Sequence, residues 1–194
     1  MDEAAPLDGR RVRGAESRRT ILAAASAVIV EDGVGGLSHR VVAERAGVPL
    51  ARVGYHFPTV DDLMIAATAR YLDEFDERLA SMAASAVASG RPLAEACADF
   101  LEELIGPGAR EFLAMVEVRL ALHRRGLVVD DTDSIVKVLR GFGAREQQIA
   151  PVVASLFGFA LLAATTDTPV PRQVVKNHVH VVFEGAAHTL EVGT

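Results

Sequence analysis

The sequence of 194 residues contains a single cysteine, no tryptophan and only 5% aromatic residues. One cysteine cannot form a disulfide within the chain. Cys97 lies on the apolar side of a predicted helix, which favours a small core residue in a reducing compartment. Residues 1–16 lack an apolar run, so we expect no signal peptide. Since no nucleophile elbow, phosphate-binding glycine loop or pair of catalytic carboxylates occurs, we expect no enzyme.

Long hydrophobic runs are also scarce. The longest uncharged stretch covers residues 147–166, and its strongly apolar part covers only residues 149–164. That part is shorter than the roughly 20 residues that a membrane helix requires, and it includes Pro151 and Gly158. We therefore expect a helix buried on most sides, no membrane partner and a cytoplasmic protein.

Strand alternation, hairpin turns and internal repeats are missing, and the apolar residues instead recur at helical spacing. Residues 1–16 lack this period and predict a disordered arm. One apolar stripe continues from Thr59 to about Ala88, which predicts a single long helix. The other predicted helices cover residues 17–33, 38–47, 49–57, 92–106, 109–125, 130–142, 144–166 and 171–190.

The net charge of −6 is unevenly distributed. Between Gly9 and Val60, eight arginines face four acidic residues, so this segment carries +4 and the rest of the chain carries −10. Such segregation fits a DNA-binding end and a body that DNA avoids. An acidic globular protein with a basic tail would show a similar distribution.

Residues 38–57 read as two short helices joined by a tight turn. Ser38 is suited to cap the first helix, and Gly47 accepts the left-handed conformation in which helices often end. Pro49 fits the first turn of the second helix, which carries Arg52 and Tyr55. A short helix of this kind suits the major groove of DNA, although an ordinary pair of helices would have the same spacing.

The segments RRTILAAASAVIVEDG, LSHRVVAERAGV and YHF, followed by Thr-x-Asp-Asp-Leu, make residues 18–63 resemble the DNA-binding domain of the TetR family of transcriptional regulators. Three positions depart from the family pattern. Pro49 replaces the usual Ser or Thr cap, Gly54 replaces an aromatic residue, and Val60 replaces a lysine that contacts phosphate.

This resemblance implies an all-α protein with two domains. A three-helix helix-turn-helix domain would cover residues 17–63, and a larger helical domain for effector binding and dimerisation would cover residues 64–194. Among the residues expected at the DNA, Arg52 is assigned to a bidentate contact with guanine, and the flanking polar residues to phosphates. The expected DNA-binding residues are Ser38, Arg40, Leu50, Ala51, Arg52, Tyr55, His56 and Thr59.

The resemblance also implies a homodimer in which the last two long helices pair with their copies. Two reading helices would then lie about 34–36 Å apart on a near-palindromic operator. The predicted interface residues are Val152, Leu156, Phe159, Val175, Val179, Val182 and Ala186.

A repressor released from its operator by a small molecule is the function that this family membership would imply. Because the body is rich in Ala, Val and Leu, its cavity and effector should be largely apolar. The candidate lining residues, which could equally be plain core, are Phe100, Leu104, Met115, Arg119 and Phe157.

Two alternatives use the same helices differently. His180, Glu184 and His188 recur every four residues and share one face of the last helix, as ligands in a helical-bundle metalloprotein would. No second helix offers a matching cluster, and we expect no metal or cofactor. The helix pair at residues 38–57 would also serve a dimeric protein-interaction module.

Overall fold

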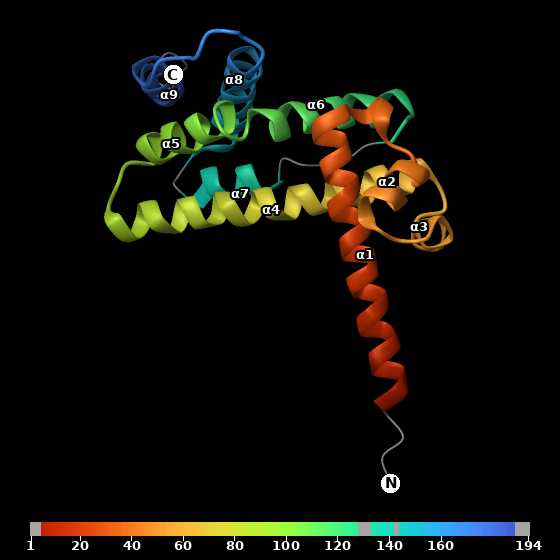
Figure 1. The fold of residues 1–194 in the computed structure, drawn as a ribbon. Coiled ribbons are helices and arrows are strands. Elements are labelled where there is room, and N and C mark those ends of the chain that lie inside the picture. Colours follow the sequence, from red (N-terminus) through yellow and green to blue (C-terminus); the bar gives the residue numbers. More distant parts are fainter. Residues whose placement is uncertain (1–4, 128–132, 142–143, 189–194) are drawn as a thin grey trace. The chain divides into compact units, whose positions relative to one another are not determined.

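The computed structural model describes residues 5–127, 133–141 and 144–188, and all regular structure within them is helical (Figure 1). The predicted all-α fold is confirmed. The elements, in chain order, are α1 (Ala5–Asp32), the 3-10 helix η1 (Val34–Gly36), α2 (His39–Ala46), α3 (Leu50–His56), α4 (Val60–Ser89), α5 (Leu93–Ile105), α6 (Ala109–Arg124), α7 (Asp133–Gly141), α8 (Glu146–Ala164) and α9 (Arg172–His188).

The chain forms two compact units. The first consists of Met1–Leu72 and Ala114–Val129, and the second of Asp73–Leu113 and Asp130–Thr194. Helix α4 is unbroken over 30 residues, as predicted, and belongs in part to each unit. Helix α6 also belongs in part to each unit. The predicted domains, which meet at residue 63, did not include this division.

The core of the first unit joins α1, α2, α3 and the first turns of α4. Ile21 and Val28 of α1, Val42 of α2 and Val53 of α3 are fully buried, and Phe57 after α3 is 2% exposed. This is the three-helix core that the apolar pattern predicts. Helix α6 completes it through three residues at helical spacing: Ala114, Val118 and Leu122.

The prediction of a disordered arm at residues 1–16 is wrong from Ala5 onward, where α1 begins. These residues have no apolar stripe, but Ala, Leu, Arg and Glu are strong helix formers. They also extend a helix that residues 17–32 already nucleate, and adding residues to an existing helix avoids the cost of nucleation.

In the second unit, Leu139 of α7 packs with Ile149 and Val152 of α8. Helix α5 buries Ala96, Ala98 and Leu101, and α9 buries Val175 and Val179. At the edge, Asp99 of α5 pairs with Arg91 and with Arg172 of α9. Burial raises the pKa of the Cys97 thiol to about 12, which keeps it protonated and unreactive.

Candidate nucleic-acid interface

The turn between α2 and α3 has the capping geometry that the sequence predicts. The Val41 N–H donates to Ser38 Oγ at 3.2 Å, so Ser38 caps α2. Gly47 ends that helix at φ 63°, a left-handed conformation that favours glycine. Pro49 stands directly before α3, where its missing N–H costs no helical hydrogen bond. Three residues, Gly47 to Pro49, therefore separate the end of α2 from the start of α3.

Helix α3 has one buried and one exposed side. Val53 is fully buried, whereas Leu50 is 53% exposed and Tyr55 83% exposed. Ala51 and Arg52 are also exposed, as is Arg40 on α2. The residues predicted to meet DNA on this helix thus face outward together, with His56 half-buried beside the Tyr55 ring at a centroid distance of 5.3 Å.

Three contacts hold this outward face in place. His39 Nε2 lies 2.7 Å from the Phe57 carbonyl oxygen, which ties the start of α2 to the end of α3. Arg45 of α2 pairs with Glu31 of α1, and Arg45 Nη1 donates to Glu31 Oε2 at 2.7 Å. The Arg18 guanidinium lies 5.2 Å from the centre of the Phe57 ring. His39 was not among the residues predicted for the site, because only its place in the first turn of α2 distinguishes it in the sequence.

Thr59, one of the residues predicted to contact DNA, caps the start of α4. The Thr59 hydroxyl donates to Asp62 Oδ2 at 2.8 Å and accepts from the Asp62 N–H at 3.0 Å. This reciprocal cap commits the hydroxyl proton of Thr59 to Asp62. The side chain of Val60, one of the three departures from the family pattern, packs partly against the core.

The structure resembles solved regulators over most of its length. It matches the multidrug binding protein EbrR in complex with imidazole at 31% identity and a TM-score of 0.72, covering 86% of this chain and 89% of that one. It matches the ethidium complex of EbrR at 30% identity and a TM-score of 0.74, covering 86% of this chain and 98% of that one. It matches a TetR-family member from Streptomyces coelicolor A3 at 30% identity and a TM-score of 0.63, covering 86% of this chain and 98% of that one.

The chain belongs to the TetR family. It is therefore a DNA-binding transcriptional regulator, as the motifs in residues 18–63 predict. By sequence, the chain matches no family model and no curated protein.

The residues predicted to line an effector pocket in this TetR-family protein are divided between the two units. Met115 and Arg119 belong to the first unit, where Met115 packs against the core of the DNA-binding helices. Phe100, Leu104 and Phe157 belong to the second unit. Helix α6 divides between the units after Leu113, and the shared pocket stays a prediction.

The aromatic residues of the second unit form two edge-to-face pairs. Phe75 of α4 and Phe100 of α5 lie 5.4 Å apart between ring centroids, and Phe112 of α6 and Phe157 of α8 lie 5.5 Å apart. Glu102, also on α5, pairs with Arg172 through Oε2 at 3.2 Å. Its Oε1 is buried and has no hydrogen-bond partner among the described residues.

Three predicted interface residues are core residues of the single chain. Val175 is 1% exposed, Val179 is fully buried and Val152 is 3% exposed, so the prediction that they meet a second copy is wrong. Both sides of α9 carry valines, and the buried side packs within its own unit. Leu156, Phe159 and Val182 are half-buried, Phe159 is stacked on His178 at 4.2 Å, and the Ala186 side chain lies outside the described residues.

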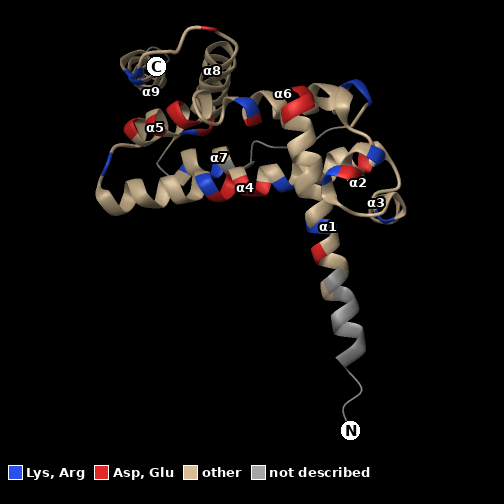
Figure 2. Ribbon diagram, viewed as in Figure 1, with Lys and Arg blue, Asp and Glu red and all other residues tan. Residues whose placement is uncertain are grey.

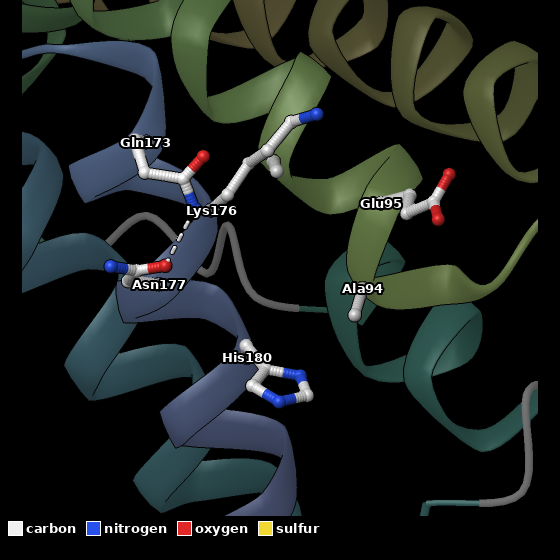
Figure 3. Close-up of a pocket in the computed structure, with 7 residues that line it drawn as sticks. Ala94, Glu95, Gln173, Lys176, Asn177 and His180 are labelled. Atoms are coloured by element: carbon white, nitrogen blue, oxygen red, sulfur yellow. Dashed lines mark hydrogen bonds between the residues drawn. The ribbon is translucent and has the colours of Figure 1, made fainter.

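A shallow groove of about 280 Å³ lies between α5 and α9 (Figure 3). Most of its lining surface is apolar, although five of the seven lining residues are polar or charged. Gln173 donates to Asn177 at 2.8 Å. His180 turns to Glu184, 3.1 Å away. The described residues contain no group of three His, Cys, Asp or Glu placed to hold a metal, and the side chain of His188 lies outside them. The lining residues are Ala94, Glu95, Ala98, Gln173, Lys176, Asn177 and His180.

Proposed function

We propose that this protein is a homodimeric repressor in the cytoplasm, which binds a near-palindromic operator and leaves it when a small molecule binds. The observation that carries the proposal is the outward face of α3, a rigidly supported short helix with Arg52 at its exposed leading end. In a family of DNA-binding regulators, such a helix is placed to enter the major groove.

The charge distribution supports this orientation toward DNA. Helix α3 contains one arginine and no acidic residue. Helix α4 carries six acidic residues and two arginines, and α5 carries four acidic residues and no basic one (charges coloured in Figure 2). A phosphate backbone attracts the first surface and repels the others. We assign Arg52 to base recognition, and Ser38, Arg40, Tyr55 and His56 to phosphates. Thr59 caps the start of α4 and is proposed to lie next to a phosphate.

Binding to a duplex selected from a random pool should weaken with salt. If one Arg40 from each protomer neutralises a phosphate, the dissociation constant should rise about tenfold between roughly 50 and 200 mM salt, because bound counterions are released. Fluorescence anisotropy at several salt concentrations measures this slope. An affinity that does not change with salt would contradict the proposed mode of binding.

A second copy of the chain is proposed to cover the exposed side of α8. Within this 19-residue helix only Ile149, Val152 and Ala160 are buried. Its exposed side is uncharged over three turns and consists of Ala150, Pro151, Ala154, Phe157 and Leu162. On α9, Val174 and Val181 are exposed and lie two turns apart.

Helix α8 is long and apolar enough to cross a membrane. Core and interface helices of soluble proteins can have the same length and composition. Two-fold pairing is the better match for this side of α8, because a palindromic site requires two reading helices in one particle.

The effector is proposed to be a flat aromatic cation. EbrR, which shares 30% identity with this chain, was solved with ethidium, a molecule of that class. The second unit offers the complementary chemistry, since aromatic faces attract cations and Glu102 has a buried carboxylate oxygen without a hydrogen-bond partner. A largely apolar effector, as the composition predicts, would then carry one positive charge.

Ethidium titration tests this class. We expect the dye to bind with increased fluorescence and to lower the affinity for operator DNA. Glu102→Gln should weaken dye binding about tenfold, because a carboxylate in contact with a cation contributes more than an amide. Glu103→Gln is the matched control, since Glu103 is exposed and pairs with Arg78. If the two substitutions have equal effects, Glu102 does not contact the dye.

A further inference from the structure

A carboxylate from α6 contacts the connection between the first two helices of the DNA-binding unit. The Val34 N–H, at the start of η1, donates to Glu117 Oε1 at 3.1 Å. The two residues are 83 positions apart in the sequence. An acceptor in this place satisfies one of the N–H groups that the first turn of a helix leaves without a partner.

Gly33 makes this approach possible. Its φ of 72° lies in the left-handed region, and a Cβ atom there would stand 3.0 Å from Glu117 Oε2. A side chain at this position would be strained and would also press on the carboxylate. The bend at Gly33 and the acceptor at Glu117 therefore form one structural feature.

Glu117 is itself held firmly. On the same helix, Ala114, Val118 and Leu122 are buried in the core that contains α1, α2 and α3. Two turns after Glu117, Arg125 Nε lies 3.3 Å from Asp61 Oδ1 at the start of α4. The carboxylate thus projects from a packed helix whose end is tied to a second segment beside the proposed DNA contacts.

We propose that Glu117 is a positioning residue for DNA binding. Residues 33–37 determine where α2 begins, and α2 carries Ser38 at its cap and supports α3. Glu117 accepts a hydrogen bond from Val34 and so holds this connection in place. Ser38 and α3 then already have, in the free protein, the positions in which they contact the duplex. Binding then requires less ordering of the free protein. This role depends on DNA binding and is independent of the identity of the effector.

A mutant cycle tests the inference on the full-length protein and a duplex selected from a random pool. Glu117→Ala should raise the dissociation constant about three- to tenfold, the range of a typical hydrogen bond. Glu117→Gln should recover most of the affinity, because its amide oxygen also accepts. Val34→Pro removes the donor at a position where helices tolerate proline, and in that background Glu117→Ala should have no further effect.

The control separates position from charge. Removing a negative charge should by itself strengthen DNA binding, which is the expected effect of Glu111→Ala at an exposed position earlier on α6. If Glu117→Ala lowers the melting temperature but leaves the dissociation constant unchanged, Glu117 is only structural and the inference fails. Additive effects of Glu117→Ala and Val34→Pro would also overturn it. Should Val34→Pro not fold, failure of Glu117→Gln to restore binding decides against the inference.

Discussion

Leu162→Asp is expected to yield folded monomers that bind the operator at least about a hundredfold more weakly than the native protein. Leu162 is 71% exposed on the uncharged side of α8, where a second copy is proposed to pack. In a two-fold interface each copy would bury a carboxylate without a partner, at a cost of several kcal/mol. Without the partner, each half-site must be bound separately, which removes the gain from linking two binding events.

Sedimentation velocity and DNA titration measure the two parts of this effect. Two valines of similar exposure provide a matched comparison: Val181 on α9 is 66% exposed, and Val87 near the end of α4 is 69% exposed. We expect Val181→Asp to yield monomers and Val87→Asp to leave the dimer intact. If all three variants sediment as dimers, the interface lies on another surface.

Arg52→Ala is expected to cost about 1–3 kcal/mol of operator binding and to relax base preference at one position of each half-site. Arg52 is exposed at the leading end of α3, and in that helix only its side chain can donate two hydrogen bonds to guanine O6 and N7. The loss should be confined to the operator, because random DNA does not present that guanine in register.

Titration against the operator and its single-base variants measures this preference. Arg40→Ala serves as the comparison, since Arg40 is exposed on α2 and is assigned to a phosphate. It should weaken all duplexes alike and lower the salt slope by about one for each phosphate that the protein no longer neutralises. Equal losses of affinity for Arg52→Ala on specific and random DNA would show that its assignment to a base is wrong.

Features that depend on local chemistry could be predicted from the amino-acid sequence. Ser38, Gly47 and Pro49 predicted the turn between α2 and α3 because capping and backbone preference act within a few residues. Helical spacing also places Val53 and Phe57, four residues apart, on one side, and both are buried. An unbroken apolar stripe likewise predicted α4 over its whole length, since period needs no knowledge of the partner surface.

The contacts between distant residues could not be predicted in this way and are known from the folded structure. Helices α8 and α9 are apolar on more than one side, so period alone could not distinguish Val175, which is buried in its own unit, from Val174, which is exposed. Nothing within α6 marked the division after Leu113, or the contact of Glu117 with Val34. Such choices depend on the shape of surfaces brought together from distant parts of the chain, and local sequence does not contain that information.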